Sequence, residues 1–133
     1  MRFGFFGINF GACAAPDVQR RVALAAEEAG FESVWTGEHV ALPIQGNPVP
    51  TPAETPFLDS VTALTRVAAL TSRIRLGTGI LVLPHHNPVL LAKSLATLDV
   101  LSGGRLIAGF GGGYAEPEFR ALGVSFHLSL IHI

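Results

Sequence analysis

The sequence is poor in cysteine and in charged residues, and each shortage excludes a class of protein. Its 133 residues include a single cysteine, Cys13, which excludes an internal disulfide and fits a reducing compartment, so we expect a cytoplasmic location. Charged residues make up 14% of the chain, and the formal net charge is −1. Proteins that bind nucleic acid or an anionic membrane surface usually carry a basic excess, so we expect neither partner.

The sequence also lacks a long hydrophobic run, although 49% of its residues are hydrophobic. A membrane-spanning helix needs about 20 predominantly apolar residues in a row. Basic residues interrupt the apolar segments here, at Arg66, Arg73, Arg75 and Lys93, so we expect no membrane span. A short chain buries a smaller fraction of its surface than a long one, so we expect the surplus apolar surface to pack against something outside the sequence.

Four apolar segments alternate with four helical patterns. The expected strands are residues 2–8, 32–36, 74–83 and 105–110, and the expected helices begin at Pro16, Pro56, Pro88 and near Glu116. Strands that alternate with helices predict parallel βα units. Their spacing of about 30 to 40 residues fits either a doubly wound sheet or a (β/α)8 barrel. The first and last strands would be open edges, which pair with other chains unless they are covered.

Polar residues and glycines gather at one end of these expected strands. The groups are Asn9-Phe10-Gly11 after the first strand, Glu38-His39 after the second, Gly77-Thr78-Gly79 and Pro84-His85-His86-Asn87 with the third, and Gly111-Gly112-Gly113-Tyr114 after the fourth. The carboxyl ends of parallel strands are where α/β folds bind their ligands. The opposite ends carry ordinary turn residues, so the sequence predicts a site on a single rim.

Each of these groups has two interpretations. Glu38 and His39 are either a solvated loop pair or an acid–base pair, because an imidazole exchanges protons near neutral pH. The three glycines are either a flexible turn or a place where backbone approaches a flat ligand closely. Adjacent histidines seldom converge on one point, so we interpret His85 and His86 as an exposed loop and expect no metal site. Cys13 has no charged neighbour in sequence and is interpreted as a bystander.

Two segments resemble the N-terminal half of the luciferase-like monooxygenase superfamily, AAEEAGFESVWTGEHVALP and RIRLGTGILVLPHHNPVLLAKSLATLDVLSGGRLIAGFGGGYAEPEFRALGV. Within it, they look most like the deazaflavin (coenzyme F420)-dependent oxidoreductases. The resemblance covers residues 1–126. It implies a TIM (β/α)8 barrel of the bacterial luciferase-like type, of which this chain holds the first half, four βα units. It also implies hydride transfer between F420 and a small organic substrate, with an FMN-dependent monooxygenase that uses dioxygen as the alternative.

The resemblance assigns roles to residues of the rim. His39 and Glu38 match the catalytic pair, with His39 as the expected proton donor. Gly79-Ile80 matches a bulge, often a non-proline cis peptide, that supports the cofactor ring. The cofactor-binding set is Asn9, Gly79, Ile80, Gly111, Gly112 and Gly113. The chain departs from the family pattern at Gly112, where many relatives have Thr or Val, and at Tyr114, where Trp or Glu is commoner.

The end of the sequence departs from the pattern as well. A whole barrel needs about 250 residues, and residues 121–133 contain no Asp, Glu, Lys or Arg. We interpret 1–126 as the N-terminal half of a barrel domain and 127–133 as an atypical tail from a truncated or misread gene. The second hypothesis is therefore an inactive half-barrel fragment that forms homo-oligomers or lacks its C-terminal half.

Overall fold

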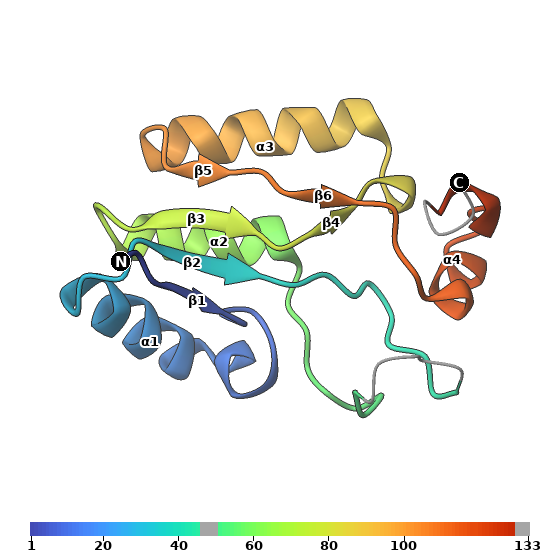
Figure 1. Ribbon diagram of the computed structural model, residues 1–133, viewed down its shortest axis with the longest axis horizontal. Coiled ribbons are helices and arrows are strands. Elements are labelled where there is room, and N and C mark those ends of the chain that lie inside the picture. The colour runs from blue at the N-terminus through green and yellow to red at the C-terminus, as the bar shows by residue number, and fades with distance from the viewer. Residues whose placement is uncertain (46–50, 130–133) are drawn as a thin grey trace.

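The computed structural model describes residues 1–45 and 51–129 and has an α/β architecture built on parallel strands (Figure 1). Four strands form the main sheet in the order β1-β2-β3-β5. Their bounds are Gly4–Phe6, Ser33–Thr36, Arg75–Thr78 and Leu106–Ile107. All three pairings are parallel, with Val34 between Phe5 and Leu76. The predicted parallel βα units are therefore confirmed.

The third and fourth expected strands are each broken in two. Beyond β3 and β5, the short strands β4 (Leu81–Val82) and β6 (Phe110–Gly111) form a second parallel pair. A cis peptide bond joins Gly79 to Ile80 between β3 and β4, as the family resemblance implies. The Thr78 hydroxyl lies 2.9 Å from Gly109 O and accepts from Gly109 N at 2.8 Å. These side-chain contacts take the place of backbone hydrogen bonds between the two strands. The prediction that 74–83 and 105–110 are continuous strands is therefore wrong, because each is interrupted in its middle.

The helices follow the strands in alternation. They are α1 (Pro16–Glu28), α2 (Ser60–Leu70), α3 (Pro88–Ser102) and α4 (Glu116–Ala121), with 3-10 turns η1 (Gly11–Ala14), η2 (Leu83–His85) and η3 (Phe126–Leu128). The predicted starts at Pro16 and Pro88 are confirmed. The predicted start at Pro56 is wrong, because the Asp59 side chain accepts Thr62 N at 2.7 Å and caps the helix there.

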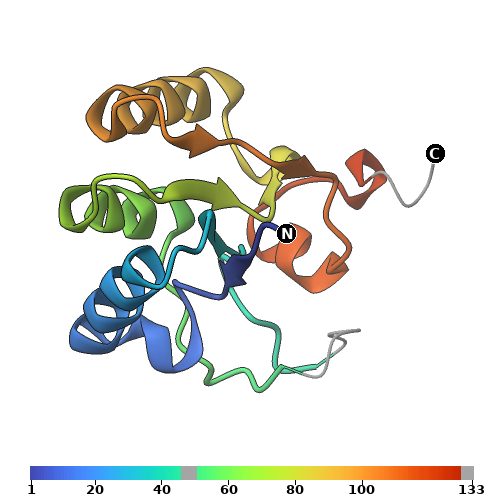
Figure 2. The same cartoon turned by 60° about the vertical axis from the view of Figure 1, so that its left-hand side comes forward.

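The core lies between the sheet and three helices. Figure 2 shows α1, α2 and α3 stacked on the same side of the strands. Val34 and Leu76 of the sheet are fully buried against Leu64 and Val67 of α2 and Leu98 of α3. Burying a side chain of this size contributes roughly 1.5–3 kcal/mol. This packing fixes the strands, and with them the residues at their carboxyl ends.

The opposite face of the sheet has no helix over it within the described residues. Phe6 and Phe110 are both exposed on the molecule. Trp35 lies over Gly77, where an added Cβ would be 2.2 Å from the indole ring. Glycine is therefore needed beside this tryptophan in the neighbouring strand.

The edges of the sheet are the strands that the sequence predicted. Among the described residues, β1 pairs with β2 alone and β5 pairs with β3 alone within the four-stranded sheet. Closure of these edges into a barrel stays a prediction. In the part of the chain that the structure describes, every helix is too short or too polar to cross a membrane.

Candidate functional site

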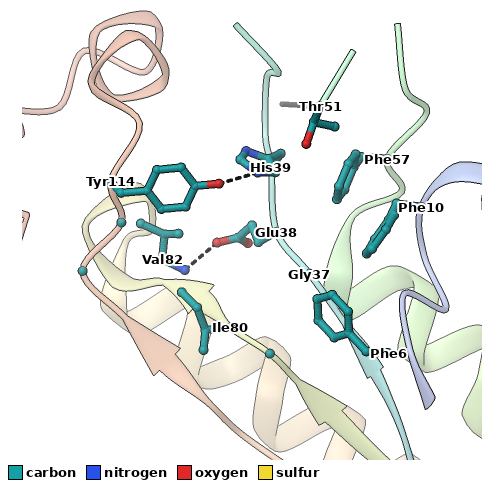
Figure 3. Close-up of a pocket in the computed structure, with 13 residues that line it drawn as sticks. Phe6, Phe10, Gly37, Glu38, His39, Thr51, Phe57, Ile80, Val82 and Tyr114 are labelled. Carbon is teal, nitrogen blue, oxygen red and sulfur yellow. Dashed lines mark hydrogen bonds between the residues drawn. The ribbon is translucent and has the colours of Figure 1, made fainter. Parts of the chain in front are cut away.

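A cavity of about 630 Å³ lies at the carboxyl ends of the strands, on the predicted rim (Figure 3). Its lining residues are Phe6, Phe10, Gly37, Glu38, His39, Thr51, Phe57, Gly79, Ile80, Val82, Gly112, Gly113 and Tyr114. Six of the eight predicted site residues are among them, and Asn9 and Gly111 are not. The rim therefore brings most of the predicted residues together, while their roles toward a cofactor stay predictions.

Three phenylalanine rings form one wall of the cavity (Figure 3). Phe10 and Phe57 stack with centroids 4.7 Å apart, and Phe6 meets Phe10 edge-on at 5.6 Å. An isolated bridge between Phe10 and Phe57 joins the loop after β1 to the segment before α2. Figure 3 shows Ile80, Val82 and Tyr114 on the opposite side of the cavity, with His39 between the two walls. The cavity is thus mostly apolar with a few polar groups, as small-molecule sites usually are.

His39 is held by both of its ring nitrogens. Nδ1 lies 3.1 Å from Glu118 Oε2, and Nε2 lies 3.2 Å from the Tyr114 hydroxyl. The imidazole also meets the Phe57 ring edge-on at 5.3 Å. Because β2 ends at Thr36 and the chain continues without helix, His39 can reach α4 from the rim. The imidazole therefore has one fixed orientation at the edge of the cavity.

Glu118 was not predicted from the sequence, although it organises this part of the site. Its Oε1 accepts hydrogen bonds from Val40 N at 2.5 Å and Ala41 N at 3.2 Å. Burial alone would raise the pKa of Glu118, but the hydrogen bonds from His39, Ala41 and Val40 outweigh it and lower that pKa. Glu118 is therefore a carboxylate at neutral pH. It lies 79 positions from His39, so no local spacing could have paired them.

Glu38 bonds to other groups than His39 does, and it joins two elements. Its Oε2 accepts Val82 N at 2.6 Å, and its Oε1 lies 2.9 Å from His86 Nε2. Burial raises the pKa of Glu38, against the opposing effect of the bonds from Val82 and His86. Both carboxylate oxygens are used to hold the segment after β2 to β4 and to the residue that follows η2. This geometry favours a structural role, and the predicted catalytic role stays untested.

The interpretation of the two adjacent histidines as an exposed loop is wrong. His86 pairs with the buried carboxylate of Glu38, which is distant in sequence. The His85 ring packs edge-on against Phe119 at 4.5 Å. Within the described residues, both of its ring nitrogens are buried without a hydrogen-bond partner. Burial lowers the pKa of His85, so its ring stays neutral at neutral pH.

Asn9 lies beneath the cavity rather than on its wall. It is fully buried, and its Nδ2 donates to Gly37 O and Leu58 O, each at 2.8 Å. Its Oδ1 accepts Gly37 N at 3.0 Å. Every polar atom of this side chain therefore bonds to backbone, so Asn9 positions the residue that precedes Glu38 and His39.

The glycines after β5 make room for protein side chains as well as for the cavity. A Cβ on Gly111 would lie 2.6 Å from Ile80 Cδ1, so this glycine lets Ile80 pack on the strand. Gly113 has φ +77 and a Cβ there would lie 2.6 Å from Val82 Cγ1. Its carbonyl accepts the Ser129 hydroxyl at 2.6 Å, so the described part of the tail packs on the site. Residues 130–133 of the predicted tail lie outside the described residues.

Comparison with known proteins identifies relatives for most of the chain. The family model described as luciferase-like monooxygenase matches residues 1–130. An uncharacterized Mycobacterium tuberculosis protein is 38% identical over 111 residues, which cover 77% of this chain and 39% of that protein. The F420-dependent glucose-6-phosphate dehydrogenase of Kineococcus radiotolerans is 38% identical over 113 residues, which cover 84% of this chain and 31% of that enzyme.

A solved structure shares the fold. The monooxygenase RslO1 from Streptomyces bottropensis matches with a TM-score of 0.73 and 33% identity, over 99% of this chain and 39% of that one. This chain therefore spans less than half the length of the proteins it matches.

Proposed function

This chain belongs to the luciferase-like monooxygenase family, and we propose that it is an oxidoreductase whose cavity binds the ring of coenzyme F420 beside a small organic substrate. Its relatives include an F420-dependent dehydrogenase and a monooxygenase. These relatives support oxidoreductase chemistry and leave the cofactor open. We choose the deazaflavin because the Glu38-His39 pair and residues 73–123 look most like the F420-dependent branch.

The observation that carries this proposal is the makeup of the cavity. Stacked phenylalanine rings face Ile80 and Val82 across it, and such surfaces suit a flat, largely apolar ring system. His39 and Tyr114 supply polar groups on one side. None of the described lining residues is Lys or Arg. The residues present therefore fit the ring end of a flavin or deazaflavin, and the phosphorylated tail would need contacts beyond them.

The side chains of the cavity would position the reactants and handle the accompanying proton. Bound there, F420 would exchange a hydride with the substrate, whereas FMN with dioxygen would support oxygenation. His39 is oriented by two contacts, and a histidine can exchange a proton near neutral pH. The phenylalanine wall would exclude water from the part of the cavity that holds the ring.

Cofactor titration tests this proposal directly. We expect F420 to bind with quenching of its fluorescence, and FMN to bind more weakly. Gly112→Leu should weaken F420 binding by about tenfold, or about 1.4 kcal/mol, because it adds bulk at a residue that lines the cavity. Ser94→Leu is the matched control, since Ser94 lies exposed on α3 and is not one of the lining residues. The affinity of Ser94→Leu for F420 should equal that of the unchanged chain.

The same titration separates the alternatives. Binding of FMN alone would contradict the deazaflavin and support the monooxygenase. Binding of neither cofactor would contradict a working site in this chain and support the inactive half-barrel fragment. Equal binding by Gly112→Leu and Ser94→Leu would place the ligand elsewhere.

We also propose that the chain self-associates through its uncovered sheet. The edge strands are open within the described residues, and the apolar side chains of Phe6, Phe110 and Ile80 are exposed. Light scattering after size-exclusion chromatography should give at least twice the monomer mass. Phe110→Lys should shift the chain toward the monomer, because it replaces an exposed apolar side chain with a charged one. A monodisperse monomer of the unchanged chain would contradict the proposal.

A further inference from the structure

The contacts of His39 fix which of its nitrogens carries the proton. Glu118 Oε1 accepts hydrogen bonds from Val40 N and Ala41 N, and its Oε2 faces His39 Nδ1. An ionised carboxylate accepts hydrogen bonds and donates none, so Nδ1 carries the hydrogen. A neutral imidazole then has its lone pair on Nε2, which accepts the hydrogen of the Tyr114 hydroxyl.

We propose that Glu118 is the positioning residue of this site and that Tyr114 is the outer member of a Tyr114–His39–Glu118 proton relay. The inference deepens the proposed function, on which it rests, because it names the group that exchanges a proton with the ligand. Exposure falls along the series, from 38% for Tyr114 to 11% and 3% for the His39 and Glu118 side chains. Tyr114 also lines the cavity. A proton would therefore enter or leave through the phenol.

The relay conserves protons at each step. In uptake, the Tyr114 oxygen gains a proton from the ligand while its own hydrogen passes to His39 Nε2. The ring is then protonated on both nitrogens, and the Glu118 carboxylate stabilises its positive charge through Nδ1. In the reverse direction, Nε2 returns the hydrogen to the Tyr114 oxygen and the phenol donates to the ligand.

Of the two carboxylates of α4, Glu118 is buried and Glu116 is exposed. Burying a carboxylate is costly unless it is paired and hydrogen-bonded, and Glu118 has three donors from the segment 39–41. Glu116 lies on the same helix and makes only an exposed contact with Arg120 at 3.0 Å. Glu116→Gln is therefore a matched control for Glu118→Gln.

The imidazole tautomer provides the main test, without any cofactor. Nitrogen-15 NMR of the side chains distinguishes the two neutral tautomers, and the His39 signals are identified by their loss in His39→Gln. We expect the Nδ1–H tautomer in the unchanged chain. In Glu118→Gln the Oε1 stays with the backbone donors, so the amide nitrogen faces Nδ1 and donates to it. The majority tautomer should switch to Nε2–H, while Glu116→Gln and Tyr114→Phe should keep Nδ1–H.

The phenol provides a second readout, because Tyr114 is the single tyrosine of the chain. Burial raises the pKa of Tyr114, and the Glu118 charge raises it further. Titration of tyrosinate absorbance, with circular dichroism to confirm folding, should show a lower pKa in Glu118→Gln and no change in Glu116→Gln.

The outcomes separate this inference from the proposed function. An Nε2–H tautomer in the unchanged chain would overturn the relay, whether or not any variant folds. An unchanged tautomer and tyrosine titration in Glu118→Gln would also overturn it. Failure to bind F420 and FMN would overturn the proposed function and would leave the tautomer result standing.

Discussion

Asn9→Ala is expected to lower the free energy of unfolding by about 3 kcal/mol, because it leaves buried backbone groups without partners. Asn9 is 0% exposed and satisfies Gly37 N, Gly37 O and Leu58 O through its amide. Water cannot replace these bonds without opening the segment that leads to His39. Such a loss is a large share of the 5–15 kcal/mol that typically stabilises a domain.

Urea unfolding followed by the fluorescence of the single tryptophan, Trp35, measures this effect. Asn9→Asp keeps an acceptor for Gly37 N but cannot donate to the two carbonyls when ionised, so we expect a similar loss. Ser94→Ala, on the exposed side of α3, should stay within about 0.5 kcal/mol of the unchanged chain. A loss below about 1 kcal/mol in Asn9→Ala would show that these bonds contribute little.

The rim could be predicted because it depends on local patterns. Apolar segments predicted the strands. Because parallel strands run in one direction, Glu38, His39, Ile80 and Gly112 were predicted to lie at the carboxyl end of the sheet. The structure brings these four residues to one cavity. Their position therefore followed from chain order and strand direction alone.

The partners of these residues could not be predicted, because they depend on contacts between distant elements. Glu38 bonds to Val82 N at a separation of 44 positions, and His39 meets Glu118 at 79. An ionisable pair adjacent in sequence thus splits into two separate clusters in the fold. One holds the strands together, and the other faces the cavity.

Asn9 shows a related limit. A polar residue at the end of a strand can face a ligand or satisfy buried backbone, and the sequence pattern is the same for both. The choice depends on Gly37 and Leu58, which reach Asn9 only after β2 pairs with β1 and the segment before α2 folds against the loop after β1. The predicted start of α2 at Pro56 was wrong because the segment holds two helix-start signals. Proline is one and Asp59 is the other, and the helix begins after Asp59, whose side chain caps it.

Phe119→Ala is expected to lower the free energy of unfolding by about 3–5 kcal/mol, because it empties a fully buried aromatic site. Phe119 is fully buried, and its ring packs edge-on against Phe126 at 5.2 Å as well as against His85. It follows Glu118 in α4, so it anchors the helix that orients His39.

The His85 ring determines how much stability Phe119→Ala loses within the range of about 3–5 kcal/mol. Its nitrogens have no hydrogen-bond partner among the described residues, so water that enters the space left by Phe119→Ala can bond to them. This gain offsets part of the cost, and we expect the free energy of unfolding to fall by about 3 kcal/mol. Phe3→Ala is the matched control, since Phe3 is 59% exposed and the same truncation should cost less than half as much. Equal losses in the two variants by urea unfolding would mean that α4 is not anchored through Phe119.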